Sequence, residues 1–130
     1  MNDKISDFLI RIKNASMAGI RRVVIPHSKG IESLANVLKN EGLLETVEVA
    51  AEKNKKNLIV TIGLVGETVR PLEVKRISKP GRKMYIKAKD IKKSSRGLGI
   101  LVISTPKGLM ANKEAVKNNL GGEIICKIQF

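Results

Sequence analysis

The sequence predicts a mixed α/β (α+β) fold built as two small lobes. Apolar residues recur at helical spacing in two early segments and alternate in strand fashion in several later ones. The chain has 130 residues, which suits one domain or two small lobes, and 42% of them are hydrophobic, as in folded proteins. We expect an N-terminal α-β-α-β-β lobe over residues 1–66 and a basic, mostly β C-terminal lobe with one short helix over residues 67–130.

Two amphipathic helices are predicted in the N-terminal lobe. The first covers residues 4–14, where apolar side chains fall on one face: Ile5, Phe8, Leu9 and Ile12. The second is expected to have its N-cap at Ser28 or a residue near it and to be closed by Gly42. Its inward-facing side chains also have helical spacing, and they are Ile31, Leu34, Ala35 and Leu38.

Three strands complete this lobe. Residues 23–25 form a short apolar run that a proline stops, as expected for a buried strand. Residues 47–51 and 58–62 read as a β-hairpin with a basic tip at residues 54–57. The following stretch, residues 63–71, is the expected seam between the lobes.

The C-terminal lobe is predicted to consist mainly of strands. Alternating apolar residues indicate a strand over residues 84–88, and residues 94–99 are a flexible lead into an apolar strand at 100–103. A short helix is expected to be capped by Asn112 and to run to about Asn118. The last strand should present one apolar face made of Ile124, Cys126, Ile128 and Phe130.

The charge of the chain is strongly positive and unevenly placed. Lys and Arg number 25 against 12 Asp and Glu, a formal net charge of +13, and residues 70–96 hold eleven basic and two acidic residues. The excess positive charges repel one another and so destabilise the folded chain unless a polyanionic partner neutralises them. Nucleic acid is the preferred class of partner, and an anionic membrane surface is the second. With no Trp, two Phe and one Tyr, the chain lacks an aromatic platform for stacking many bases.

Catalytic and metal-binding constellations are missing from the sequence. A single Cys cannot form an internal disulfide, and one Cys with one His cannot supply the four ligands of a structural zinc site. His27 lies at a strand-to-helix turn and reads as a surface or capping residue, and Cys126 reads as a buried structural thiol. We therefore expect no enzyme activity and no cofactor. No transmembrane or signal segment is apparent, so the chain should act in the cytoplasm, where it is made.

Two loops carry polar groups suited to RNA. Ser104, Thr105, Lys107 and Gly108 combine hydroxyls that can bond base edges with a cation that can reach phosphate. The same loop could be an ordinary Ser/Thr turn. Gly121–Glu123 permits close approach of a ligand, or it could simply end a helix. The basic segment supplies the cations that we expect to contact phosphate: Lys79, Arg82, Lys83 and Lys87.

Several blocks of the sequence resemble one family. The opening residues 5–15, ISDFLIRIKNA, resemble the first helix of bacterial small-subunit ribosomal protein eight, and residues 37–42, VLKNEG, resemble the end of its second helix. The most specific blocks lie in the C-terminal third, and they are residues 76–82 (RISKPGR), 97–100 (GLGI), 104–108 (STPKG) and 121–126 (GGEIIC). Their order and spacing cover essentially the whole chain.

This resemblance implies a two-lobed α/β protein that binds small-subunit ribosomal RNA. It implies recognition of an irregular helix in the central domain early in assembly, contact with neighbouring small-subunit ribosomal proteins, and no membrane. In some bacteria, members of the family also repress translation of their own operon's messenger RNA. The resemblance implies a base-reading loop at Ser104, Thr105 and Lys107. It also implies that the Gly121–Glu123 turn lies against the same RNA, with Tyr85 and the hairpin tip at Lys55 close by. We expect the N-terminal lobe to grip the RNA backbone, through Arg11 and Asn14.

The chain departs from the family pattern at two places. Pro106 replaces the last serine of the common Ser-Thr-Ser tripeptide, which removes a hydroxyl and a backbone N–H. Asp3-Lys4 stands where the family commonly has Asp-Pro. Two other functions remain as alternatives on residues alone. An architectural DNA-binding protein would use the same charge but usually shows a recognition helix or a dimer seam, and a small RNA-processing enzyme would need more than His27.

Overall fold

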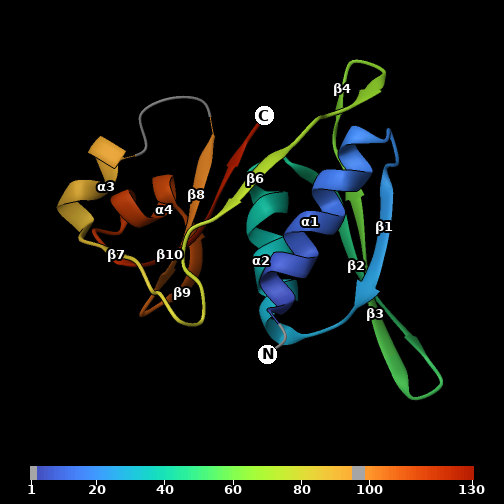
Figure 1. Cartoon of the computed structure of the whole chain (residues 1–130), viewed down its shortest axis with the longest axis horizontal. Helices are drawn as coiled ribbons and strands as arrows, with labels where there is room; N and C mark the ends of the chain where they lie inside the picture. Colours follow the sequence, from blue (N-terminus) through green and yellow to red (C-terminus); the bar gives the residue numbers. More distant parts are fainter. Residues whose placement is uncertain (1–2, 95–98) are drawn as a thin grey trace. The chain divides into compact units, whose positions relative to one another are not determined.

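The computed structural model describes residues 3–94 and 99–130. The chain divides into two compact units, one ending at Leu72 and one beginning at Glu73, so the expected boundary after residue 66 falls inside the first unit. Figure 1 shows the helices and strands of both units. Their mixture of helices and sheets confirms the predicted α/β class.

The first unit follows the predicted α-β-α-β-β order. Its elements are α1 (Lys4–Met17), β1 (Arg22–Pro26), α2 (Lys29–Asn40), β2 (Leu44–Glu52) and β3 (Lys55–Ile62). The strands form an antiparallel sheet in the order β1-β3-β2, and both helices cover one of its faces (Figure 1). Alternate strand residues therefore enter the core together with helix residues, among them Val23, Ile25, Leu58, Val60, Phe8, Leu9, Ile12, Leu34 and Leu38.

Local signals fix where the two helices begin and where α2 ends. The Asp3 carboxylate accepts a hydrogen bond from the Ser6 N–H at 3.2 Å. The Ser28 hydroxyl accepts one from the Ile31 N–H at the same distance, which confirms Ser28 as the N-cap of α2. Gly42 has a φ of +82°, the left-handed conformation that closes a helix, as predicted.

The last turn of α1 holds the end of the first unit. This helix continues past the predicted end at residue 14, and its buried Ser16 hydroxyl donates to the Lys13 carbonyl at 2.7 Å. The same hydroxyl accepts from the N–H of Leu72, which is buried, at 3.1 Å. Residues 63–71 are thus part of the first unit and form a hairpin of β4 (Leu64–Val65) and β5 (Thr68–Val69).

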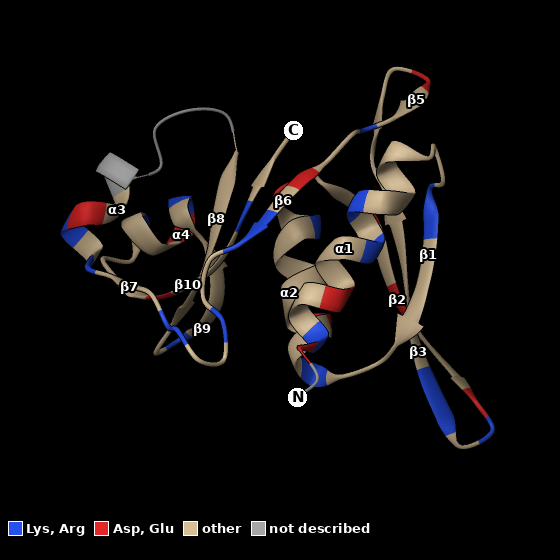
Figure 2. Ribbon diagram, in the orientation of Figure 1, with Lys and Arg blue, Asp and Glu red and all other residues tan. Residues whose placement is uncertain are grey.

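The β2–β3 hairpin is present, but its turn is tighter than predicted. Glu52 pairs with Lys55, so the turn consists of Lys53 and Asn54 rather than residues 54–57. Lys53 has a φ of +56°. The tip is basic, as Figure 2 shows, and its exposed cations are Lys53, Lys55 and Lys56.

The second unit is an antiparallel sheet with two short helices. Its elements are β6 (Glu73–Arg76), β7 (Tyr85–Ile86), α3 (Ala88–Ser94), β8 (Ile100–Thr105), β9 (Gly108–Ala111), α4 (Asn112–Lys117) and β10 (Gly122–Gln129). The strand order is β6-β10-β8-β9, and β7 also pairs with β10. Ile91 of α3 and Ala115 of α4 are buried against Leu101 and Ile103 of β8. Both helices therefore cover the same face of the sheet.

The predicted strand over residues 84–88 is largely wrong. Only Tyr85 and Ile86 pair with β10, and Ala88 begins α3, so this unit has a second helix that the sequence did not predict. Ile91, one helical turn after Ala88, is fully buried. A three-point alternation is too short to distinguish a strand from the start of a helix. Residues 95–98 of the expected lead, including Gly97, lie outside the described residues.

Two further expectations are wrong because tertiary contacts override local patterns. Asn112 does not cap α4, since its buried Oδ1 accepts a hydrogen bond from the Leu101 N–H at 3.2 Å. The last strand does not present one apolar face, because a β-bulge shifts the register between Ile124 and Cys126. These two residues pair with consecutive residues of β8 and point to opposite faces, and Phe130 is 46% exposed.

Candidate nucleic-acid interface

A basic loop, residues 79–83, connects β6 to β7 and is held closed at its base. Lys79 and Arg82 exchange two backbone hydrogen bonds of 2.9 Å across the turn. The buried Ser78 hydroxyl accepts from the Met84 N–H at 2.9 Å and donates to the Met84 carbonyl at 3.3 Å. The backbone of the loop is therefore fixed at its base. The loop carries three exposed cations, namely Lys79, Arg82 and Lys83.

Gly121 and Gly122 allow three strands to meet at close range. A Cβ atom on Gly121 would lie 2.5 Å from the Ile86 carbonyl oxygen, and one on Gly122 would lie 2.0 Å from the Ser104 carbonyl oxygen. Both distances are far below van der Waals contact, so any side chain here would force β7 or β8 away. The pair of glycines therefore holds the ends of β7, β8 and β10 together.

This close approach places three polar side chains in one row across the sheet. Glu123 of β10 pairs with Tyr85 of β7 and with Ser104 of β8. Directly paired residues of antiparallel strands project from the same face, so these three side chains form a polar row. The row lies on the face opposite Ile103 and the helices, because Ile103 adjoins Ser104 in the strand. Tyr85 is 69% exposed, and the other two are half-buried.

The turn between β8 and β9 adds a cation beside the polar row. Lys107 is exposed, and Pro106 occupies the first central position of the turn, where its fixed φ is well accommodated. Thr105 is buried, and its hydroxyl donates to the Gly108 carbonyl at 2.8 Å and accepts from the Lys107 N–H at 3.1 Å. Among the described residues, the Ser104 hydroxyl has no such partner. The two neighbouring hydroxyls thus have different environments.

Most of the predicted contact residues lie in the second unit. They are Lys79, Arg82, Lys83, Tyr85, Lys87, Ser104, Thr105, Lys107, Gly108, Gly121, Gly122 and Glu123. The other three lie in the first unit. Lys55 starts β3 beside the hairpin tip, Asn14 is exposed on α1, and Arg11 forms an exposed ion pair of 3.5 Å with Asp7 one turn earlier.

His27 and Cys126 have structural environments. The Nε2 atom of His27 lies 2.6 Å from a carboxylate oxygen of Glu32, which links the turn before α2 to its first turn. Burial raises the pKa of the Cys126 thiol to about 12, against the opposing effect of the Arg76 guanidinium. A protonated thiol is a poor nucleophile. Within residues 3–94 and 99–130, no cluster of His, Cys, Asp and Glu could hold a metal ion, and no helix is long and apolar enough to cross a membrane.

Cys126 should make stability fall with rising pH in alkaline solution. The unfolded thiol ionises near its ordinary value of 9.0, whereas the folded thiol keeps its proton until about pH 12. Between these values the unfolded state binds fewer protons, so the free energy of unfolding should fall by up to about 1.4 kcal/mol per pH unit. Urea titrations from pH 8 to 11 should show a steeper fall for the natural chain than for Cys126→Ala. Equal slopes would contradict this burial effect.

Comparison with known proteins identifies the family. The chain matches the family model described as Ribosomal protein S8 over residues 3–129. Small ribosomal subunit protein uS8 of Nautilia profundicola is 44% identical over 130 residues, which cover 98% of each chain. The uS8 proteins of Mycoplasmopsis synoviae and Nostoc punctiforme are 42% and 40% identical, over 98% of this chain and 98% and 97% of theirs. The resemblance seen in the sequence blocks is confirmed, and the chain belongs to the ribosomal protein S8 family.

Proposed function

We propose that the chain binds small-subunit ribosomal RNA through the polar row and the basic loop of its second unit. As a member of the ribosomal protein S8 family, it is a non-enzymatic structural constituent of the small ribosomal subunit in the cytoplasm. One observation carries the proposal of this binding surface. The close packing at Gly121 and Gly122 brings Tyr85, Glu123 and Ser104 into one row beside exposed cations.

Each group in this surface suits a different part of an RNA. The Ser104 hydroxyl can bond a base edge or a 2′-hydroxyl, and the Glu123 carboxylate can accept from a base amino group. The exposed Tyr85 ring can stack on a single unpaired base. The cations of the basic loop, with Lys107, can neutralise phosphates. An irregular helix offers all of these features together, because its unpaired bases expose edges that regular pairing occupies.

The finer roles in this proposal come from the family resemblance. The target would be an irregular helix in the central domain of the small-subunit RNA, bound early in assembly. A messenger RNA of the chain's own operon that folds into a similar helix would compete for the same surface, and its translation would then be repressed. Neighbouring small-subunit proteins would contact other parts of the chain.

A direct binding comparison tests the proposal. A gel-shift titration at physiological salt would compare three ligands of equal length, namely an RNA hairpin with the irregular helix, a regular RNA duplex and a DNA duplex. We expect the irregular RNA to bind about 10³-fold more tightly than either duplex. Equal affinity for the DNA duplex would support the architectural DNA-binding alternative instead. Cleavage of labelled RNA that Cys126→Ala retains and His27→Ala loses would support an RNA-processing enzyme.

Ser104→Ala and Thr105→Val should have different consequences. Ser104→Ala removes a hydroxyl available to RNA, so it should weaken binding of the irregular RNA by roughly 1–3 kcal/mol and leave random RNA and the salt dependence unchanged. Thr105→Val breaks hydrogen bonds inside the turn and should lower stability as well as affinity. Filter-binding titrations at two salt concentrations measure the first effect. Equal losses on both RNAs would contradict a base-reading role for Ser104.

Pro106→Ser is the companion test of the family's third hydroxyl. The proline sits in the turn rather than in a paired position of either strand, so its replacement should leave the fold intact. Restoring the hydroxyl should leave affinity for the irregular RNA equal or higher in the same titrations. A loss of affinity would contradict the idea that this position tolerates or uses a hydroxyl donor.

A further inference from the structure

The outer edge of β2 is open. The sheet of the first unit has the order β1-β3-β2, so β1 and β2 are its two edge strands. Within the described part of the chain, no strand pairs with the outer side of β2, and its nine residues leave a row of backbone donors and acceptors available. Proteins usually protect such edges with charged side chains, above all Lys, with Pro or with short length. The β1 edge has these features, because it is shorter, begins with Arg22 and ends with Pro26.

The β2 edge is long, and its only charged side chains are the acids Glu45, Glu48 and Glu52. It contains no Lys, Arg or Pro, and its only bulge lies at the start, between Leu44 and Thr46. The strand therefore offers a long backbone template to an added strand. An edge of this kind is a site for β-augmentation by an extended peptide.

The two faces of β2 differ: the helix-covered face is apolar, and the opposite face carries Glu48 and Glu52 together with Thr46 and Ala50. Val49 pairs with the buried Leu58 on the helix-covered face, yet it is 45% exposed because it lies at the edge. Ala51 is exposed on the same face. Glu48 and Glu52 are exposed on the opposite face. An added strand would therefore meet apolar surface on one face and carboxylates on the other.

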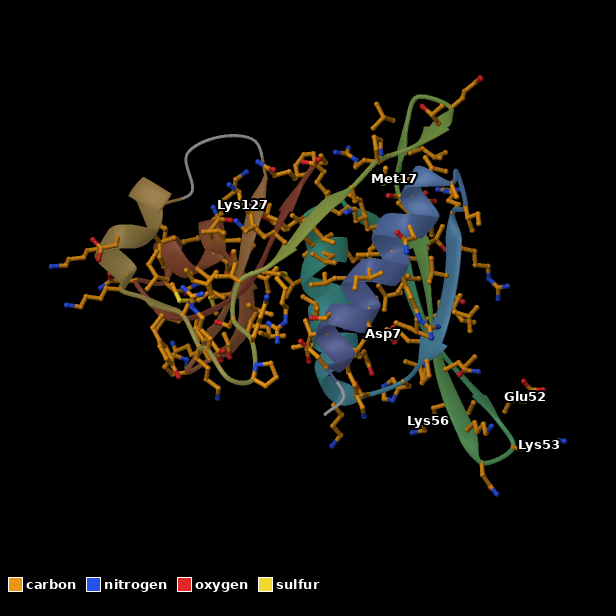
Figure 3. All side chains as sticks on the ribbon, in the orientation of Figure 1. Asp7, Met17, Glu52, Lys53, Lys56 and Lys127 are labelled. Atoms are coloured by element: carbon orange, nitrogen blue, oxygen red, sulfur yellow. The ribbon has the colours of Figure 1, made fainter. Side chains whose placement is uncertain are left out.

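The charge at this edge is opposite to that of the chain. Residues 41–52 contain Glu41, Glu45, Glu48 and Glu52 and no Lys or Arg, although the whole chain carries +13. Figure 2 shows the acidic colour on β2 beside the basic hairpin tip, and Figure 3 shows Glu52 near that tip, with Lys53 and Lys56. The strand carries three exposed carboxylates. Glu45 is ion-paired with Arg21, and Glu48 and Glu52 lie nearer the hairpin tip. A carboxylate-lined edge repels RNA phosphates and attracts cationic side chains.

We propose that the β2 edge docks an extended basic segment of a neighbouring protein in the small ribosomal subunit. The segment adds as a strand, with alternate apolar side chains against Val49 and Ala51 and alternate Lys or Arg side chains against Glu48 and Glu52. A second copy of this chain is disfavoured as the partner, because it would bring two acidic edges of the same charge together. This proposal rests on membership of the ribosomal subunit and is independent of the RNA surface in the second unit.

Photo-crosslinking in assembled small subunits tests the docking strand. The full chain would carry p-benzoylphenylalanine in place of Ala51, and in a separate sample in place of Tyr85. We expect the adduct from position 51 to be a protein segment that alternates apolar and basic residues. An RNA adduct, a dimer of this chain or no adduct at position 51 would overturn the proposal. The adduct from position 85 tests the RNA surface separately, so failure of one proposal is distinguishable from failure of the other.

A charge reversal shows whether the carboxylates select the partner. Glu48→Lys in the position-51 sample should reduce the protein adduct at least tenfold, because the new lysine would repel the basic side chains of the docked segment. Glu67→Lys is the matched control, since Glu67 is an exposed acid in the turn between β4 and β5 of the same unit. It should leave the adduct unchanged. Equal adduct yields from both variants would overturn the assignment of Glu48.

The backbone contribution is tested with a synthetic probe. An eight-residue peptide that alternates Val and Lys would be titrated into the isotopically labelled full chain, and amide shifts in β2 would be followed by NMR. A control peptide with every second backbone nitrogen methylated keeps the same charge, but it cannot donate backbone hydrogen bonds along one of its two edges. We expect it to bind at least tenfold more weakly. Equal binding of the two peptides would overturn strand addition.

Discussion

Replacing Lys79, Arg82 and Lys83 together by alanine should weaken binding of every RNA, on the order of 100-fold at low salt. Each cation that contacts a phosphate releases counterions, so removing all three should reduce the slope of log affinity against log salt by about 2 to 3. The loop should keep its shape, because its base is fixed by backbone hydrogen bonds and by the buried Ser78 hydroxyl. Titrations of irregular and random RNA at several salt concentrations measure both quantities.

A second triple variant separates local contact from general charge. Lys89, Lys113 and Lys117 are exposed on α3 and α4, which lie on the face opposite the polar row. Their joint replacement by alanine changes net charge by the same amount. We expect a much smaller change in salt slope from this control. Equal slopes for the two triple variants would mean that RNA is attracted by diffuse charge rather than by the basic loop.

Gly122→Ala should be among the most destabilising single substitutions in the second unit. The added methyl group would lie 2.0 Å from the Ser104 carbonyl oxygen, and backbone cannot rotate away as a flexible side chain can. Overpacking of this kind costs roughly 1–3 kcal/mol of unfolding free energy. Separation of β8 from β10 would also move Ser104 away from Glu123 and weaken specific RNA binding. Urea denaturation measures the first effect, and the gel-shift comparison measures the second.

Gly81→Ala is the matched control for this substitution. Gly81 lies in the turn of the basic loop, and a Cβ there would meet nothing within 4 Å. Its replacement should change the free energy of unfolding by about 0.5 kcal/mol or less. Similar stability of the Gly122→Ala and Gly81→Ala variants would contradict the close approach of strands as the reason for the paired glycines.

The elements that the sequence predicted correctly are those whose signals are local. The helical spacing around Phe8 and Leu34, the cap at Ser28 and the closure at Gly42 need no knowledge of distant residues. The excess of cations over residues 70–96 likewise follows from composition, and the structure places three of them on one well-held loop. Amphipathic periodicity was least informative where only two or three residues carry the pattern, as at the start of α3.

The features that escaped prediction depend on contacts between distant segments. Nothing near Ser78 in the sequence shows that its hydroxyl is buried and fixes the basic loop. The role of Thr105 inside its own turn and the burial of Asn112 depend on how β8 and β9 pair. The sequence shows the paired glycines, but the reason for them lies in β7 and β8, which approach from other parts of the chain. Register and close packing are set by tertiary structure, so local patterns cannot specify them.

Directed cleavage of ribosomal RNA from a single tethered position tests the proposed RNA surface most directly. Lys107→Cys supplies an exposed thiol beside the polar row, and Cys126 is buried and protonated, so an iron chelate should attach at position 107 alone. Glu67→Cys supplies the control position in the first unit. On the small-subunit RNA, we expect the position-107 probe to cut a short set of nucleotides confined to one irregular helix. Dispersed cuts, or cuts no stronger than those from position 67, would contradict recognition of RNA by this surface.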